Sequence, residues 1–239
     1  MRVVSYNVRS LRDDADAVAA ILRGLAPDLV CVQEAPRFLF SARTCRALAA
    51  AAGLSVLAGG RSAAGNLLLG GPRVRLVSAS RVRLPRSGRR HRRALALAVV
   101  EVGRNADPAD GGARLLLGGT HLSLDPLERE QQTRRVLAHL ETADAPHRVL
   151  GADVNDVPGS RVWTLLTGPL RDAWALAPTG GELTFPARGP NRRIDALLVS
   201  PGVAVRAAGV PADLAADPAA ATDHLPVLAE LELPLEQGT

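Results

Sequence analysis

The stretch His147-Arg-Val-Leu-Gly-Ala-Asp-Val-Asn-Asp-Val-Pro-Gly-Ser160 passes from an apolar run into a loop. Its Val-Leu pair is typical of a buried strand, and its Pro-Gly-Ser end is typical of a loop. Asp153 and Asn155 stand two residues apart at the crossing point, so in an extended chain both side chains share one face. In that position one side chain could hold a metal ion or a water molecule, and the other could hold a substrate oxygen. An Asx-rich turn is the alternative, because Asp and Asn hydrogen-bond their own backbone.

The bulk composition indicates a chain that can bury a large core. The 239 residues are 47% hydrophobic, and aromatic residues make up only 3%, so Leu, Val and Ala must build that core. The formal net charge is +5, and every one of the 29 basic residues is arginine. This charge permits a nucleic-acid partner without requiring one, because the composition as a whole is rich in Arg, Ala, Gly and Pro.

Cysteine usage and hydropathy bear on where the protein works. Cys31 and Cys45 form no CxxC motif, so neither a zinc knuckle nor a disulfide framework is expected. We see no signal-peptide pattern and no apolar stretch that could span a membrane. We therefore expect a cytoplasmic protein without a transmembrane segment, acting as a monomer.

Apolar periodicity predicts a chain of many strands with helices between them. Strands are predicted over 3–6, 29–32, 54–57, 66–69, 74–82, 94–102, 114–118, 194–199, 203–207 and 227–233. Helices are predicted over 13–25, 41–52, 125–142 and 162–166. The third helix has Asp125 at its cap and Glu128 three residues later, the spacing of a capping box. The mixture favours an α/β sandwich over a parallel barrel, and the lack of a repeat or long linker predicts a single domain over residues 1–239.

Two loops are expected between these strands. A Gly/Asp/Pro segment separates the strands over 94–102 and 114–118. Residues 81–93 form an arginine-rich run containing Pro85 and Gly88. Such a run is most often a solvated face. The alternative is a loop that contacts phosphate beside a cleft.

Polar side chains that can bind metals or carry protons stand at the ends of one apolar run after another, either directly after the run or at its start. They are Asn7, Glu34, His121, Asp153 with Asn155, Asp195, and Asp223 with His224. Rigid elements that present such groups at their ends are how functional sites are held in place. Carboxylates and amides without clustered cysteines suit Mg²⁺ or Mn²⁺, and histidine beside carboxylates suits proton transfer. The GxSxG, GxxxxGK[ST] and GxGxxG motifs are all missing, so serine hydrolase, P-loop and dinucleotide-binding functions lack support.

In their order and spacing, these motifs resemble the endonuclease/exonuclease/phosphatase superfamily. The resemblance runs from Ser5-Tyr-Asn-Val8 to Thr222-Asp-His-Leu-Pro-Val227. Between them lie Asp28-Leu-Val-Cys-Val-Gln-Glu34, Gly65-Asn66, Thr120-His-Leu122, Asp153-Val-Asn-Asp-Val-Pro158 and Arg193-Ile-Asp195. It implies the deoxyribonuclease I-like fold, a four-layer α/β (α+β) sandwich of two packed mixed sheets flanked by helices. It also implies an enzyme, a divalent-metal-dependent hydrolase of phosphoester bonds.

The resemblance further implies a role for each position. Glu34 would be the principal metal ligand, with Asn7 orienting it and Asp223 on the metal side. Asp153 would position or deprotonate the attacking water, and Asn155 would hold a phosphate oxygen. His121 would stabilise the transition state, and His224, oriented by Asp195, would transfer a proton. Asp153 and His224 remain joint candidates for the general base.

Departures from the family pattern narrow the expected function. Arg9 replaces an acid of many nuclease members, and Ala35-Pro36 follows Glu34 where abasic-site endonucleases carry Thr-Lys. Ala152 replaces a glycine, and Ala196 replaces an aromatic residue. We therefore expect a phosphodiesterase or nuclease of the broader branches, acting on a phosphoester substrate that can be nucleic acid. The alternatives are a phospholipid or small-molecule phosphodiesterase or phosphatase, and a catalytically silent binding module.

Overall fold

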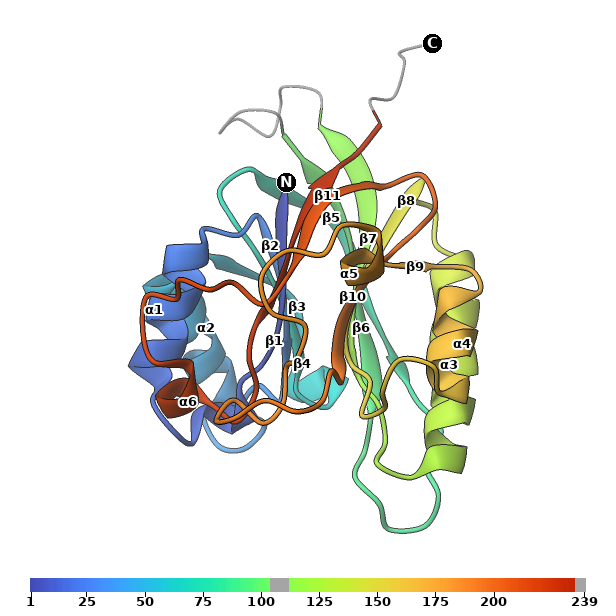
Figure 1. The fold of residues 1–239 in the computed structure, drawn as a ribbon, viewed down its shortest axis with the longest axis horizontal. Coiled ribbons are helices and arrows are strands. Elements are labelled where there is room, and N and C mark those ends of the chain that lie inside the picture. The colour runs from blue at the N-terminus through green and yellow to red at the C-terminus, as the bar shows by residue number, and fades with distance from the viewer. Residues whose placement is uncertain (104–111, 235–239) are drawn as a thin grey trace.

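Two six-stranded β-sheets pack face to face in the computed structural model, which describes residues 1–103 and 112–234 (Figure 1). The first sheet has the strand order β11 (Ala204–Gly209), β12 (Val227–Glu232), β1 (Arg2–Asn7), β2 (Leu29–Gln33), β4 (Asn66–Gly70) and β3 (Ser55–Gly60). The second has the order β5 (Val74–Arg83), β6 (Ala94–Val102), β7 (Ala113–His121), β8 (His147–Asp153), β10 (Asp195–Val199) and β9 (Arg171–Asp172). Both sheets mix parallel and antiparallel pairs.

Helices cover the outer face of each sheet and complete four layers (Figure 1). The first sheet packs on α1 (Ala15–Leu25) and α2 (Ser41–Ala51), and the second on α3 (Pro126–Glu141) and α4 (Arg161–Thr167). The short helices are η1 (Arg9–Leu11), η2 (Arg61–Ala63), α5 (Ala173–Leu176) and α6 (Pro218–Ala221). The predicted sandwich of two mixed sheets flanked by helices is thus confirmed.

Helix α1 shows how the sequence sets these layers. Asp14 caps its first turn by accepting hydrogen bonds from the backbone N–H groups of Asp16 and Ala17. Its apolar residues recur at helical spacing and are buried against the first sheet. The helix ends at Ala26, whose left-handed backbone precedes Pro27. The apolar face of α1 therefore packs on the first sheet.

The core between the sheets is made of small and aliphatic side chains. Strand β6 contributes alternate alanines, and Cys31 of β2 packs opposite Gly151 of β8. A Cβ atom on Gly151 would lie 2.4 Å from the Cys31 Cβ atom and 2.8 Å from its sulfur. This close approach brings the two central strands, and the residues at their ends, near each other.

We expect Gly151→Ala to destabilise the fold by about 1–3 kcal/mol, because the added methyl group has to force the two sheets apart. The loss would appear as a lower midpoint in urea unfolding with an unchanged slope. Gly168→Ala is the control, because its nearest neighbour would be a carbonyl oxygen at 3.5 Å. Equal stability of the Gly151→Ala variant and the parent chain would contradict this account of the packing.

Strand register places the predicted site residues at one end of the sandwich. In the second sheet Asp153 pairs with His121 on one side and with Asp195 on the other. In the first sheet Asn7, the last residue of β1, pairs with Gln33, so Glu34 follows at the next position. Strands β1, β2, β7 and β8 all end at this edge of the sandwich (Figure 1), so four chain segments bring polar residues to the same end.

Some local predictions differ from the structure. Strand β5 extends to Arg83, so the arginine-rich loop begins at residue 84 rather than 81. Asp125 caps α3 as predicted, but the Glu128 carboxylate accepts a hydrogen bond from the backbone N–H of Ser87 instead of closing a capping box. Strand β9 and the four-residue helices α5 and α6 were not predicted, because they are too short to show a periodicity.

Two further predictions concern the limits of the described chain. Most of the predicted Gly/Asp/Pro loop falls in residues 104–111, outside the described residues. The single domain over residues 1–239 remains a prediction. Within the described ranges, none of the helices combines the length and the apolar character needed to cross a membrane.

Candidate active site

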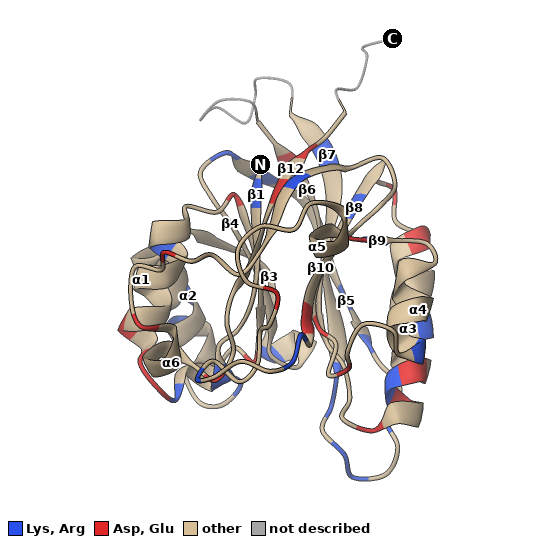
Figure 2. Cartoon of the chain, in the orientation of Figure 1, with Lys and Arg blue, Asp and Glu red and all other residues tan. Residues whose placement is uncertain are grey.

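A cluster of acids, amides and imidazoles lies where the two sheets meet at their lower edge. Acidic segments, red in Figure 2, mark the lower end of β10 between the sheets. The cluster draws residues from both sheets and from the segment before β12: Asn7, Glu34, His121, Asp153, Asp195 and His224. Residues more than 200 positions apart in sequence therefore meet at one site.

Asp153 stands at the centre of this cluster and is almost fully buried. Its Oδ2 atom accepts a hydrogen bond of 2.9 Å from the Asn7 amide nitrogen. The same oxygen lies 3.3 Å from His121 Nε2 and 3.9 Å from His224 Nε2. Three polar side chains thus converge on a single carboxylate oxygen.

Glu34 forms the more open side of the cluster. Its Oε1 atom lies 3.5 Å from the Asn7 amide nitrogen and 3.6 Å from His121 Nδ1. The backbone of Glu34 is left-handed, with φ at 53°. This turn directly after β2 carries the partly exposed carboxylate over the strand end, where a ligand from solvent can reach it.

His224 and Asp195 form a buried pair. The Asp195 Oδ2 atom lies 2.9 Å from His224 Nδ1, which leaves Nε2 facing Asp153. Thr184 accepts hydrogen bonds from the backbone N–H groups of Ile194 and Asp195, and the Phe185 ring packs on His224 at a centroid distance of 4.8 Å. The start of β10 and the plane of the imidazole are therefore both held in place.

Together, burial and neighbouring charges raise the pKa values of Asp153 and His224 to different extents. Burial, followed by repulsion from Asp195, raises the pKa of Asp153 to about 7. Burial alone would lower the pKa of His224, but the adjacent Asp195 carboxylate outweighs it and raises that pKa to about 9. Near neutral pH the site therefore holds a cationic His224 beside a carboxyl group that can gain or lose a proton.

His121 is held neutral instead. Burial, followed by repulsion from Arg93 and His224, holds the pKa of His121 well below its ordinary value. The Asn155 amide nitrogen donates to His121 Nε2 at 2.8 Å and to the Leu122 carbonyl at 3.0 Å. If Nε2 accepts this bond, the ring proton lies on Nδ1, the atom that faces Glu34.

Asn155 occupies a strained turn after β8. Its φ of 54° is left-handed, and its backbone N–H donates to Asp153 Oδ1 at 3.1 Å. The Asx-turn interpretation of this stretch therefore describes a real feature, while the metal-site interpretation remains a prediction. The turn places the amide against His121 and orients one oxygen of Asp153.

Asp223 is the predicted site residue that the structure leaves at the rim. Its carboxylate pairs with Arg9 Nε at 3.5 Å and lies 3.3 Å from the Thr222 hydroxyl. That hydroxyl donates to the backbone carbonyl of Asn7, which ties the segment before β12 to the end of β1. Asp223 acts on the buried cluster through its charge, which helps to raise the pKa of His224.

Two sets of side chains in this cluster could hold a cation. One is the oxygen-rich side with Glu34 and Asn7. The other is the buried group Asp153, Asp195 and His224, whose potential ligand atoms lie within 4.8 Å of one another. In the second group the Nδ1 atom and a carboxylate oxygen are already committed to the His224–Asp195 hydrogen bond. The first set therefore fits a hard cation better, because its carboxylate is open to solvent and to water ligands.

Sequence reasoning missed three side chains that shape the site. Arg93 is half-buried, and its charge acts on Asp153 and Glu34. The sequence shows it only as the last member of an arginine run, directly before the buried strand β6. Thr184 and Phe185 lie between the predicted helix over 162–166 and the predicted strand over 194–199, where no pattern marks them.

Two packed mixed sheets with such a cluster at their common edge define the deoxyribonuclease I-like class of αβ sandwich. A model of the Endonuclease/Exonuclease/phosphatase family matches residues 4–224. The chain belongs to this family and is a hydrolase of its superfamily. A comparison with curated proteins finds none that matches the sequence.

Solved structures with the same fold cover nearly the whole chain. An endonuclease/exonuclease/phosphatase from Bacteroides vulgatus is 20% identical, with a TM-score of 0.80 over 98% of each chain. A mannosyl-6-phosphatase from Bacteroides thetaiotaomicron is 17% identical, with a TM-score of 0.79 over 98% of this chain and 100% of that one. The D. rerio protein TDP2, complexed with a single-strand DNA product, is 19% identical, with a TM-score of 0.71 over 97% and 98%. At these identities the likeness concerns the fold alone.

Proposed function

We propose that the protein is a divalent-metal-dependent phosphodiesterase that hydrolyses phosphoester bonds by attack of water. The observation that carries this proposal is the contact of Asn7, His121 and His224 with one buried Asp153 oxygen, beside the open Glu34 carboxylate. A silent binding module would gain nothing from burying an acid whose pKa is raised this far.

Glu34 and Asn7 would hold the cation, and the donor set favours Mg²⁺ or Mn²⁺. Asp223, already engaged by Arg9, would contribute through bound water. A bound cation would neutralise charge that develops on the phosphoryl oxygens and on the leaving oxygen.

Asp153 is the better placed general base of the two candidates. With its pKa at about 7 it is ionised in a large fraction of molecules at neutral pH, whereas His224, with its pKa at about 9, is already protonated. His224 would then stabilise the phosphoryl oxygens or donate a proton to the leaving oxygen. Asp195 keeps the imidazole charged and oriented for this task.

His121 and Asn155 would hold the phosphoryl group. A neutral His121 can donate one hydrogen bond to an oxygen of the substrate as charge develops there. Asn155 would exchange its present bond to His121 for one to a phosphate oxygen. Arg93 adds positive charge on the same side.

The second candidate function is that of a phosphatase acting on small phosphomonoesters. The mannosyl-6-phosphatase of the same fold favours it, whereas the DNA product bound to TDP2 favours a diester. A phosphomonoesterase has to bind only one phosphate group. Six arginines line a cleft near Arg93, which favours the diesterase with a larger, more highly charged substrate.

We expect the protein to hydrolyse bis-p-nitrophenyl phosphate when Mg²⁺ or Mn²⁺ is present. A chelator should lower the rate by about a thousandfold, because charge at the phosphoryl group would no longer be neutralised. Returning the cation should restore it. A faster rate with p-nitrophenyl phosphate would favour the monoesterase. A rate on both substrates that is indifferent to chelator would contradict the proposal.

A further inference from the structure

The most exposed large apolar side chains of the described residues belong to two short segments. Phe38, Leu39 and Phe40 lie between β2 and α2, and Leu124 and Leu127 lie at the start of α3; each is 73–87% exposed. The remaining large apolar side chains on the described surface are at most 41% exposed. Exposed apolar side chains that are gathered in short segments are more typical of interaction surfaces than single scattered ones are.

Both segments begin at residues of the candidate active site. Phe38 follows Glu34 by four positions, and Leu124 follows His121 by three. An extended chain spans about 3.5 Å per residue, so each segment starts within roughly 10–14 Å of the site. The Asn155 amide and the Arg129 guanidinium bind the carbonyls of Leu122 and Leu124, which fixes the second segment to the site. Both connections lie at the lower end of the molecule in Figure 1.

An arginine-rich cleft with a volume of about 680 Å³ adjoins the first of these segments through Arg37. Its walls carry six arginines and no acid among the described residues: Arg37, Arg61, Arg81, Arg83, Arg86 and Arg92. None of the six has a carboxylate partner within the described part of the chain. Arg37 directly precedes Phe38, so positive charge and apolar side chains adjoin.

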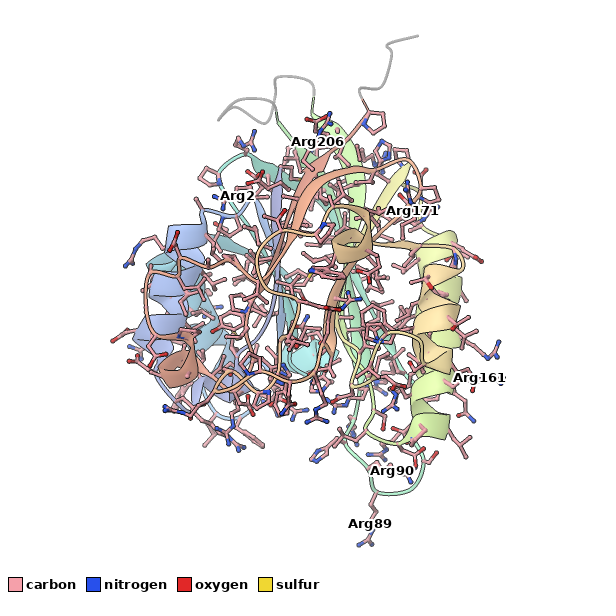
Figure 3. All side chains as sticks on the ribbon, in the orientation of Figure 1. Arg2, Arg89, Arg90, Arg161, Arg171 and Arg206 are labelled. Carbon is pink, nitrogen blue, oxygen red and sulfur yellow. The ribbon has the colours of Figure 1, made fainter. Side chains whose placement is uncertain are left out.

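The loop that carries part of this charge is anchored rather than loose. The Glu128 carboxylate accepts from the Ser87 N–H at 2.7 Å, and the Gln132 amide donates to the Pro85 carbonyl at 2.8 Å. Arg90 pairs with Asp125 at 2.7 Å. The loop is thereby held against α3, and Arg89 stands at its lowest point in Figure 3.

We propose that this rim, defined by residues 37–40, 86–92 and 124–127, docks the protein on the surface of an anionic phospholipid bilayer. Exposed Phe and Leu side chains insert at the boundary between head groups and acyl chains, and arginines attract the anionic head groups. The docked orientation faces the candidate active site toward the membrane. The inference goes beyond the proposed function, because docking does not require hydrolysis.

A nucleic acid explains these observations less completely. Its phosphates would fit the arginine cleft, and its bases could stack on Phe38 and Phe40. It offers no partner for the exposed side chains of Leu39, Leu124 and Leu127. A neutral protein partner would leave the unpaired arginines unexplained. Of these three occupants, an anionic lipid surface is the one that uses both the charge and the aliphatic side chains.

Cosedimentation of the full chain with vesicles tests the docking surface. We expect binding to vesicles of phosphatidylcholine and phosphatidylserine in equal parts, weakening with salt, and little binding to phosphatidylcholine alone. Leu39→Ser combined with Leu124→Ser should weaken binding about tenfold or more, because each segment loses an inserted side chain. Val56→Ser with Leu76→Ser, two exposed apolar residues elsewhere, is the matched control.

The charge is tested by combining Arg86→Gln with Arg92→Gln, which should weaken vesicle binding about tenfold. Thermal unfolding of each variant shows that a loss of binding is not a loss of fold. No binding by the parent chain, or equal losses in the apolar variant and its control, would overturn the proposal. So would tight binding of a labelled DNA oligonucleotide with no affinity for vesicles. Hydrolysis of bis-p-nitrophenyl phosphate without vesicles shows separately whether the proposed activity stands.

Discussion

Replacing Asp153 by Asn should lower the hydrolysis of bis-p-nitrophenyl phosphate by about a thousandfold. The amide keeps the shape of the side chain and an oxygen that can accept from Asn7, but it cannot take a proton from water, a step worth about 10²–10⁴ in rate. The comparison is of kcat at saturating Mg²⁺ for the parent chain and the variant. More than a tenth of the parent rate in the variant would exclude Asp153 as the base.

The same substitution should stabilise the fold at alkaline pH. Because burial raises the pKa of Asp153 from 3.8 to about 7, its contribution to stability is present at low pH and is lost as the pH rises through about 7. The Asn side chain removes this loss. The variant should therefore unfold at a higher temperature than the parent chain at pH 8, by a margin that narrows toward pH 5. Catalytic loss with retained stability separates a role in the reaction from a role in folding.

Asp195→Asn should lower the rate about a hundredfold and shift the alkaline limb of the pH profile toward neutral pH. In the parent chain Asp195 raises the pKa of His224 to about 9, so His224 stays protonated up to that pH. Without the carboxylate, burial lowers the pKa of His224, and the cation is lost at a lower pH. The measurement is kcat/KM across the pH range for both proteins.

The control is Asp144→Asn, which replaces an exposed acid outside the active-site cluster. This variant should keep the acidic and the alkaline limbs of the pH profile at the same pH values as in the parent chain. If His224 were instead the base, removing Asp195 would increase the fraction of active enzyme at neutral pH. A profile whose alkaline limb does not move would contradict the assigned roles of both residues.

Most of the candidate site could be predicted from sequence because its residues follow buried strands. Asn7, His121 and Asp153 each end an apolar run, and parallel pairing within each of the two sheets brings such ends to one edge. The register of β7, β8 and β10 then aligns His121, Asp153 and Asp195 side by side. Local periodicity indicated these positions, whereas their alignment depends on the pairing of strands that are distant in sequence.

What sequence could not predict depends on contacts between distant segments. Arg37 and Arg61 join the arginine loop in one cleft only because η2 and the β2–α2 connection fold beside the end of β5. Glu128 fits a capping box by spacing, yet its carboxylate binds Ser87 because the loop reaches back to α3. The pairing of Asp223 with Arg9 likewise depends on the last strand lying beside the first. No local pattern encodes such contacts.

An anomalous difference map from a crystal soaked in Mn²⁺ tests most directly whether the distant acids and amides form one cation site. We predict a peak bonded to the Glu34 carboxylate, beside Asn7, that disappears in Glu34→Gln. A map without a peak in the cluster would contradict the account. A peak enclosed by Asp153, Asp195 and His224, with Glu34 free, would contradict it equally, because the residues assigned to proton transfer would then be the metal ligands.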